Sequence, residues 1–257
     1  MIKSIFLTLL AAVPCHAANL AGMWLFDDQA NLAHATVGTD LTLAGAAPGT
    51  WAASLADDGS KSLKGVITTP AANSANRFIA THGIAANGGG AFVNEYTIVV
   101  DLFSPVASRS SWRTILQTNQ NNTNDGDYFI DPANTVGVSA LTYSTTPISA
   151  AAWTRLVVTF DLGTGVAAYT DGALFHTHSA ETVDGRFSLD PTVLFFSDQD
   201  GDNAPLNVGA LAIYDGVLTP AEISALGAAG AAIPEPTAGL LGLAALGGMA
   251  GRRRRNG

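Results

Sequence analysis

Short stretches in which apolar and polar residues alternate occur along most of the chain, and they predict β-strands. The stretch EYTIVVDLFS, residues 95–104, alternates between two faces, because successive side chains of a strand point to opposite sides of a sheet. The stretch WTRLVVTFD, residues 153–161, does the same. The residues expected to share one buried face are Tyr96, Ile98, Val100 and Leu102 in the first stretch, and Thr154, Leu156, Val158 and Phe160 in the second.

Turn-forming residues separate these stretches at short intervals, and helical periodicity is almost absent between Asn19 and Pro220. The Asp171–Gly172 pair predicts a tight hairpin, because Asp-Gly suits a two-residue type I′ turn. Many short strands joined by turns predict an all-β domain, an antiparallel two-sheet jelly-roll sandwich. Further β-rich runs lie at 23–26, 63–69, 114–117, 128–130, 192–196 and 208–214.

One short helix is expected after the last strand, in the stretch LTPAEISALGAAG. Thr219 and Glu222 have the spacing of a capping box, and Pro220 occupies the first helical position. Gly227 is placed to end the helix. Residues 228–233, which follow, are rich in Ala and have the composition of a spacer.

The N-terminal residues MIKSIFLTLLAAVPCHAANLAG have the three parts of a secretory signal peptide, namely a basic start, an apolar run and small residues. We expect a signal helix in residues 1–18, with cleavage after Ala17 or Ala18. Cys15 is the only cysteine of the chain, and Pro14 before it is atypical of a lipoprotein anchor. The exported protein is therefore expected to contain no thiol and no disulfide.

The C-terminal residues 234–257 combine a Pro-Glu-Pro motif, an apolar run and a basic cluster. We expect a short transmembrane helix in the apolar run 238–250, which is marginal as a permanent anchor because a bilayer core takes about 20 apolar residues. The arginines after the run are expected to stay on the cytoplasmic side of a membrane, which leaves the body outside. The motif consists of Pro234, Glu235 and Pro236, and the cluster of Arg252, Arg253, Arg254 and Arg255.

This order of motif, apolar run and basic cluster at the C-terminus resembles the PEP-CTERM sorting signal of Gram-negative bacteria. The resemblance implies recognition by an exosortase, a membrane transpeptidase, with cleavage near the motif after transient anchoring in the inner membrane. It also implies that the released body reaches the cell surface or an exopolysaccharide matrix. A plain C-terminal membrane anchor is the alternative.

The charge balance argues against one class of partner. The chain carries 21 Asp and Glu against 12 Lys and Arg, which gives a formal net charge of −9. Nucleic acid is therefore not expected as a partner, because its binding needs clustered positive charge. Residues 19–227, between the terminal segments, are long enough for one domain with a sizeable core.

Three blocks of the sequence together resemble the LamG-like, concanavalin A-type jelly-roll superfamily. The blocks are residues 20–45, 153–177 and 206–227. They are similar to the opening strand of that family, to its central hairpin with an Asp-Gly turn, and to its last strand with a capped helix. The resemblance implies two packed, curved antiparallel sheets. Gly209 and Ala210 stand where family members often carry an acidic residue, so no ligand role is carried over to that position.

The loop FFSDQDGDNAPLN, residues 195–207, is a candidate cation site. Calcium takes six to eight oxygen ligands in irregular geometry, so a loop rich in Asp and Asn suits Ca2+. Related LamG-like domains often bind calcium in loops, although the spacing here is not that of an EF-hand. An acidic turn held by Asx hydrogen bonds is the alternative. The candidate ligands are Asp198, Asp200, Asp202 and Asn203.

A second polar loop, NQNNTNDGDYF at residues 119–129, is a candidate ligand-binding site. Asp125 and Asp127 could bind an ion or sugar hydroxyls, and a simple hairpin turn is the alternative. Sugar binding by such folds often uses exposed aromatic rings beside polar loops. The candidate rings are Trp112 and Tyr128, together with Trp51 and Tyr143.

Two histidines, His176 and His178, have the spacing that places both on one side of a strand. Two imidazoles on one face could hold a transition metal. Because no third ligand is evident, we expect an exposed strand face instead.

These features leave three functions open. The first is an exported, non-catalytic module that binds glycans or other extracellular polymers, with or without calcium. The second is a polysaccharide-acting glycoside hydrolase or lyase, although the alternating acidic strand motif of related glucanases is absent. The third is a structural or protein-adhesive surface protein, which shares every sequence feature of the first.

Overall fold

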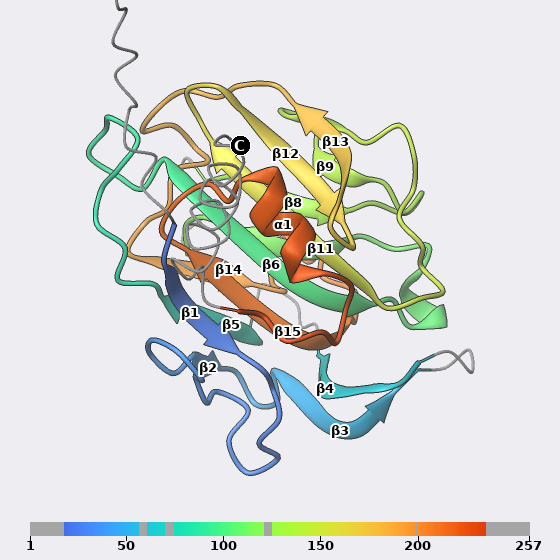
Figure 1. Cartoon of the computed structure of the whole chain (residues 1–257). Coiled ribbons are helices and arrows are strands. Elements are labelled where there is room, and N and C mark those ends of the chain that lie inside the picture. The colour runs from blue at the N-terminus through green and yellow to red at the C-terminus, as the bar shows by residue number, and fades with distance from the viewer. Residues whose placement is uncertain (1–17, 57–60, 70–74, 121–124, 199, 235–257) are drawn as a thin grey trace, which may run out of the picture.

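The computed structural model describes residues 18–56, 61–69, 75–120, 125–198 and 200–234, which form two antiparallel sheets packed face to face (Figure 1). This confirms the all-β jelly-roll prediction. Most of the expected signal helix, the apolar run 238–250, and the sorting residues Glu235, Pro236 and Arg252–Arg255 lie outside the described residues. Within the described part, no helix is long and apolar enough to span a bilayer.

The larger sheet, called sheet A, has eight strands. Strand β1 (Leu20–Trp24) pairs with β15, beside the path formed by the other seven. In order across the sheet, these seven are β13 (Ala173–His178), β12 (Gly165–Thr170), β11 (Thr154–Asp161), β6 (Glu95–Phe103), β15 (Asn207–Tyr214), β4 (Leu63–Thr68) and β3 (Gly49–Leu55).

The smaller sheet, called sheet B, has seven strands. A short 3-10 helix, η2 (Val106–Ser108), leads from β6 of sheet A toward β7 of sheet B. In order across sheet B, the strands are β10 (Thr142–Tyr143), β9 (Val136–Val138), β8 (Asp127–Ile130), β7 (Arg113–Gln117), β14 (Thr192–Phe195), β5 (Arg77–Thr81) and β2 (Thr42–Ala44).

The inner faces of the two sheets enclose the main apolar core. Tyr96 of β6 lies opposite Phe160 of β11, and their rings stack with 4.4 Å between centroids. Tyr128 of β8 packs edge-on against Phe160 from the other sheet, at 6.0 Å. The alternation predicted for β6 and β11 is confirmed, since the same core contains Ile98, Val100, Leu102, Leu156 and Val158.

The local turn and capping predictions are confirmed as well. Asp171 and Gly172 join β12 to β13 with φ values of +49° and +85°, the left-handed backbone that a type I′ turn requires. The helix α1 (Pro220–Leu226) begins after Thr219, whose side chain accepts a hydrogen bond from the backbone N–H of Glu222. The Glu222 side chain accepts one in return from Thr219, which completes the capping box.

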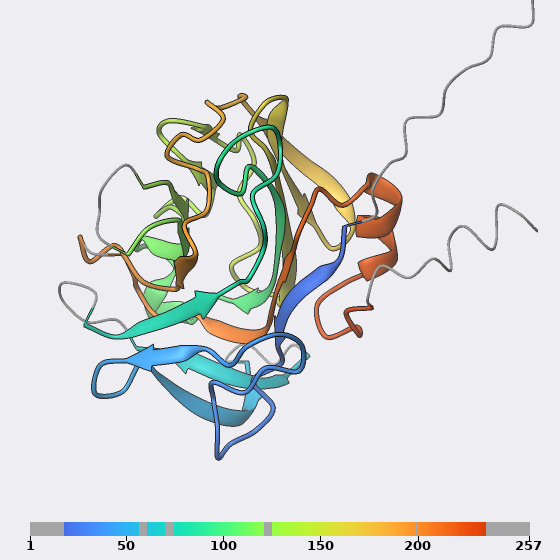
Figure 2. The ribbon, with the colours of Figure 1, turned by 90° about the vertical axis from the view of Figure 1, so that its left-hand side faces the viewer.

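Residues 227–234, here called the C-terminal strap, pack with α1 on the outer face of sheet A (Figure 2). Ile233 is buried there with side chains of β1, β6, β11 and β15, and the Tyr214 hydroxyl donates to the carbonyl of Pro234 at 3.2 Å. The composition of residues 228–233 predicted a spacer, whereas the structure shows a segment held against the domain. Because the strap and α1 cover the outer face, the central strands of sheet A are buried on both sides.

Candidate functional site

The outer face of sheet B, which points away from the core, carries the residues that form the candidate site. Strand β8 alternates: the Tyr128 ring packs on Phe160 between the sheets, so its neighbours Asp127 and Phe129 lie on the other side of the strand. Phe129 is nevertheless buried and belongs to the same apolar cluster. The register of β7 and β8 pairs Asp127 with Gln117 and Phe129 with Thr114. These four side chains therefore share one face, where two polar loops meet.

The first loop at this face is the predicted cation loop after β14. The Asp198 carboxylate accepts a hydrogen bond from the backbone N–H of Asp202 at 3.1 Å, as in the acidic turn that was the alternative interpretation. The Thr114 hydroxyl donates to the carbonyl of Asp202 at 2.7 Å, which holds the loop against β7. Burial raises the pKa of Asp198. Of the four predicted ligands, Asp198 and Asn203 are buried, Asp202 is partly buried and Asp200 is exposed.

The second loop lies between β7 and β8, and it brings its carboxylates close to those of the first. Burial raises the pKa of Asp127 to about 7. The negative charges of Asp125 and Asp198 contribute to this rise, with a smaller contribution from Asp200, and the positive charge of Arg186 opposes it. Two acidic loops that lie far apart in the sequence thus act on one carboxyl group, that of Asp127.

Several oxygen atoms in this cluster are buried and accept no hydrogen bond from the described residues. They are Oδ2 of Asp125, Oδ1 of Asp127 and Oε1 of Gln117. Asp125 is only 5% exposed, so bulk water does not readily replace the missing donors. Buried acceptors of this kind are costly unless a ligand satisfies them. Among the described residues, no group of three or more His, Cys, Asp or Glu side chains is placed to hold a metal ion.

An aromatic group borders the cluster. The Trp112 ring packs edge-on against Phe129 at 5.6 Å and lies 6.0 Å from Tyr143, measured between centroids. Trp112 and Tyr143 are partly exposed, and Phe129 is buried. Burial and then the charge of Asp131 raise the pKa of Tyr143 to about 12. The sequence pointed to Trp112 and Tyr143. The structure places Tyr143 where the charges of Asp202 and Asp127 act on it, and it places Trp112 next to Tyr143.

Tyr128, in contrast, does not lie at this face. Its side chain is 1% exposed, and its hydroxyl bonds to Nε2 of His178 at 2.8 Å inside the core. Nδ1 of His178 faces the carbonyls of Leu141 and Thr142 at 3.2 and 3.1 Å. Because a carbonyl only accepts, Nδ1 carries the proton and Tyr128 donates to Nε2. We therefore leave Tyr128 out of the candidate site.

The prediction that His176 and His178 lie on an exposed strand face is wrong for His178. His178 is buried rather than exposed, because the side of β13 that carries both rings faces the core beside Tyr128. Burial, with a further contribution from His176, lowers the pKa of His178 to about 4. The imidazole is thus neutral at physiological pH and contributes to the core.

Trp51, the remaining aromatic candidate, lies away from the site on β3 of sheet A. Its Nε1 donates to the carbonyl of Phe26 at 3.0 Å. The sequence did not single out Gln117, Phe129 or Arg186. The alternation of residues 114–117 and 128–130 was the signal that could have placed Gln117 and Phe129 on the outer face.

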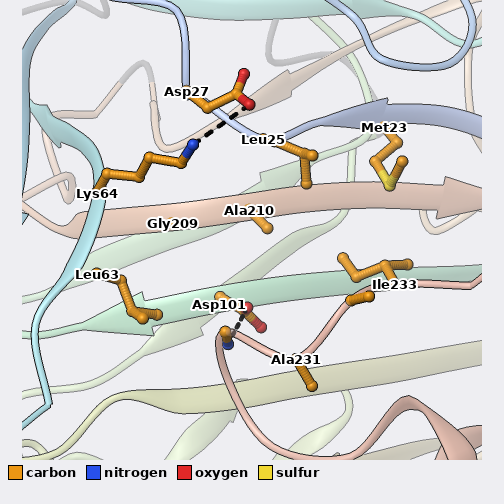
Figure 3. Close-up of a pocket in the computed structure, with 12 residues that line it drawn as sticks. Met23, Leu25, Asp27, Leu63, Lys64, Asp101, Gly209, Ala210, Ala231 and Ile233 are labelled. Atoms are coloured by element: carbon orange, nitrogen blue, oxygen red, sulfur yellow. Dashed lines mark hydrogen bonds and ion pairs between the residues drawn. The ribbon is translucent and has the colours of Figure 1, made fainter.

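A cavity of about 480 Å³ lies on the opposite side of the molecule, between sheet A and the C-terminal strap (Figure 3). Its charged groups are already paired within the protein. Lys64 Nζ lies 3.5 Å from a carboxylate oxygen of Asp27, and Asp101 accepts a hydrogen bond from the backbone of Gly230 at 2.8 Å. Ligand sites need a few polar groups that are free to orient a ligand, so the outer face of sheet B is the better candidate. The apolar residues that line the cavity include Met23, Leu25, Leu63, Ala210 and Ile233.

Comparisons with known proteins agree with this architecture. A family model described as the concanavalin A-like lectin/glucanases superfamily matches residues 94–224. Among solved structures, domain 4 of AbnA, a GH43 extracellular arabinanase from Geobacillus stearothermophilus in complex with arabinotriose, is similar at a TM-score of 0.54 and 16% identity, covering 82% of this chain and all of that domain. No curated protein matches the chain.

Botulinum neurotoxin structures are also similar in fold. One is botulinum neurotoxin type C, whose cell entry depends on interaction with two ganglioside molecules, with a TM-score of 0.53 and 13% identity over 81% of this chain. Another is the serotype D binding domain, with a TM-score of 0.55 and 14% identity over 81% of this chain. This chain spans about half the length of the neurotoxin chains, 50% and 51% respectively. At these identities the similarity shows the fold alone.

Proposed function

We propose, from the premise that the chain belongs to the concanavalin A-like lectin/glucanases superfamily, that it is a non-catalytic module that binds glycans on the outer face of sheet B. The observation that carries the proposal is the aromatic pair of Trp112 and Tyr143, close to buried acceptors that accept no hydrogen bond from the described residues. Sugar hydroxyls supply donors, and the C–H faces of sugar rings pack on aromatic rings. The arabinotriose complex and the ganglioside-dependent neurotoxin support a glycan as the class of ligand.

Glycan-array binding by the purified protein, followed by affinity measurement, tests this proposal. The array should include arabinan oligosaccharides and sialylated glycans. Trp112→Ala is expected to weaken binding at least tenfold, which corresponds to about 1.4 kcal/mol. Trp51→Ala, on sheet A, is the matched control and should leave the affinity unchanged, with the folding of both variants checked by thermal unfolding. The proposal would be contradicted if the protein bound no glycan on the array, or if the two variants lost equal affinity.

Calcium is a further part of the proposal. Asp125, Asp127 and Gln117 carry oxygens that accept no hydrogen bond from the described residues, and these oxygens are of the type that a hard cation prefers. The loop residues Asp198, Asp200, Asp202 and Asn203 would supply additional oxygen ligands. When bound, the cation would neutralise the repulsion between the two acidic loops and offer a ligand position to sugar hydroxyls.

Calorimetric titration with CaCl2 tests the calcium proposal separately from glycan binding. The double variant Asp125→Asn/Asp127→Asn is expected to lose calcium binding, because it removes two of the carboxylates. Asp28→Asn changes an exposed carboxylate remote from the site in sequence and should bind calcium like the wild type. No binding by the wild type would remove calcium from the proposal and leave the glycan test standing.

A glycoside hydrolase is the second candidate, and one observation favours it. Glycosidases use two carboxyl groups, one of which has a raised pKa and serves as general acid. Asp127, with its pKa raised to about 7 beside Asp125 and Asp198, has this property. Release of reducing sugars from a polysaccharide that the module binds, lost in Asp127→Asn while binding remains, would establish the hydrolase and replace the non-catalytic proposal.

The location of the protein belongs to the same proposal. We infer export through residues 1–18 and sorting through the PEP motif and Arg252–Arg255, by machinery of the exosortase type. The acidic body and the glycan-binding face fit a place at the cell surface or in an exopolysaccharide matrix. A purely structural or adhesive role is the remaining alternative, and it would be favoured by surface localisation without any glycan binding.

A further inference from the structure

Gln117 of β7 is a buried side chain of the candidate site with one acceptor that the described residues leave unused. The side chain is 0% exposed, and its Nε2 donates to the carbonyl of Asn119 at 2.7 Å. Its Oε1, in contrast, accepts no hydrogen bond from the described residues. The register pairs Gln117 with Asp127 of β8, so the two side chains are direct neighbours across the strand pair. An uncharged buried acceptor next to Asp127 is thus left for a donor that a ligand supplies.

The carboxylates beside Gln117 have unused acceptors and also repel one another. Oδ2 of Asp125 and Oδ1 of Asp127 are buried and accept no hydrogen bond from the described residues. Burial, and then the negative charges of Asp125 and Asp198, raise the pKa of Asp127. A neutral hydroxyl would supply a donor but would leave the repulsion in place. A ligand that brings both N–H donors and a positive charge satisfies the acceptors and relieves the repulsion.

Arg186 does not balance these negative charges. Its Nε donates to the backbone carbonyl of Asp125 at 2.9 Å, and its guanidinium group lies over the ring of Phe187, 5.5 Å from the centroid. The effect of its charge on Asp127 is smaller than that of Asp125 or of Asp198. The surroundings of Asp127 therefore stay negative, and an acidic glycan would add to the repulsion.

Trp112 and Tyr143 offer a surface on which a sugar ring can pack near the same acceptors. Their rings lie 6.0 Å apart between centroids, and both are partly exposed. The charges of Asp202 and Asp127 act on Tyr143, so the carboxylates influence the place where the sugar ring would pack. A positively charged sugar gains from both features, because the face of an aromatic ring also attracts a cation.

We infer that the outer face of sheet B selects glycans with free amino groups, whose ammonium groups bind the unused oxygens of Gln117, Asp125 and Asp127. This inference rests on the proposed glycan binding and names the class of glycan. An ammonium group supplies up to three N–H donors and a positive charge, whereas an acetylated amine supplies one donor and no charge. Glycans that carry carboxylates, such as sialylated ones, are disfavoured by the negative charge of the face.

Calorimetric titration of the purified protein with two matched trimers tests the inference. One is a β-1,4-linked trimer of glucosamine with free amines, and the other is the same trimer with every amine acetylated. A chelator removes calcium, which would compete for the same oxygens. Salt at about 0.15 M limits attraction by distant charges of the chain, because the screening length is then about 8 Å. We expect the free-amine trimer to bind at least about tenfold more tightly, since hydrogen bonds to charged groups are the stronger ones.

A pair of double variants shows whether the preference comes from this face. Asp125→Asn/Asp127→Asn keeps the shape of both side chains and removes their charges, so it should lose the preference for free amines. The matched control, Asp28→Asn/Asp40→Asn, changes the net charge equally at two exposed carboxylates and should keep the preference. Thermal unfolding checks that both variants fold. The comparison of the two trimers on the wild type tests the inference even where a variant does not fold.

Several results would overturn the inference and leave glycan binding itself intact. They are equal or tighter binding of the acetylated trimer, tighter binding of sialylated glycans than of the free-amine trimer, and loss of the preference in the control variant. Binding of another glycan by a wild type that binds neither trimer has the same meaning. A wild type that binds no glycan at all overturns the proposed function instead, so the two failures are distinguishable.

Discussion

The guanidinium group of Arg155 forms a bidentate ion pair with the carboxylate of Asp101 beneath the C-terminal strap. Nε lies 2.7 Å from Oδ1, and Nη2 lies 2.9 Å from Oδ2. Arg155 also donates to the carbonyls of Leu226 and Ala231, and the N–H of Gly230 donates to Asp101. Because both side chains are buried, their remaining donors and acceptors need these partners. The pair thus joins β6 and β11 to the end of α1 and to the strap.

Removal of Arg155 is expected to destabilise the domain strongly. Arg155→Met leaves the Asp101 carboxylate buried without its cation, and breaking a buried pair in this way costs about 3–5 kcal/mol. Urea unfolding measures the loss. The control is Lys64→Met, which removes an ion pair with Asp27 whose side chains are 55% and 40% exposed; exposed pairs contribute at most about 1 kcal/mol. Equal losses in the two variants would contradict the role of the buried pair.

The sequence predicted those parts of the fold that depend on neighbouring residues. The alternation in β6 and β11, the type I′ turn at Asp171–Gly172 and the capping box at Thr219 are local features, and all three are confirmed. The position of the strap was not predicted. The Ala-rich composition of the strap does not predict where the strap packs. The side chains that hold the strap in place lie far away in the sequence.

Gly65 of β4 is a position where the packing of sheet A requires glycine. A Cβ built on Gly65 would lie 2.1 Å from the carbonyl oxygen of Val208 on the neighbouring strand β15. Gly65→Ala must therefore push β4 and β15 apart, and overpacking of this kind typically costs about 1–3 kcal/mol. Thermal or urea unfolding measures the effect.

Gly163, in the turn between β11 and β12, provides the control for that substitution. A Cβ there would meet only the Asp161 carboxylate, at 3.7 Å. Gly163→Ala is expected to change the free energy of unfolding by less than about 1 kcal/mol, in the direction of a small gain, because alanine restricts the unfolded chain. A loss for Gly163→Ala as large as that for Gly65→Ala would contradict the steric argument.

Tyr128→Phe is expected to lower stability without any effect on glycan binding. The substitution removes the hydroxyl that donates to Nε2 of His178, which leaves a buried acceptor unsatisfied at a cost of about 1–3 kcal/mol. Because Tyr128 points into the core, the outer face of sheet B is unchanged. Unfolding and glycan affinity are measured on the same preparation. A weakened affinity at unchanged stability would show that Tyr128 belongs to the binding site.

The candidate site was only partly predictable for a related reason. The sequence marked Asp125, Asp127 and the Asp198 loop as separate oxygen-rich loops, because each has a local composition that is unusual. Their meeting depends on the pairing of β14 with β7, which brings the ends of distant strands together. No local sequence pattern predicts this pairing, so the raised pKa of Asp127 could not be predicted from the sequence.

The pKa of Asp127 gives a prediction about stability and pH. In the folded protein this pKa is raised to about 7, whereas an unfolded Asp has a pKa of about 3.9. Below about pH 4 both states are protonated, so Asp127 has no effect on the free energy of unfolding. Between about pH 4 and 7 the folded state retains a proton that the unfolded state releases, so stability falls as the pH rises. Above about pH 7 the full destabilisation is present.

Urea unfolding of the wild type and of Asp127→Asn from pH 4 to pH 8, with a chelator present, measures this effect. The stability of the wild type relative to the variant is expected to decrease as the pH rises through this window, because Asn does not titrate. The contribution of His178 has the opposite sign but is the same in both proteins, so it cancels in the difference. Asp28→Asn should follow the wild type. A difference between wild type and Asp127→Asn that does not change with pH would contradict the raised pKa of Asp127.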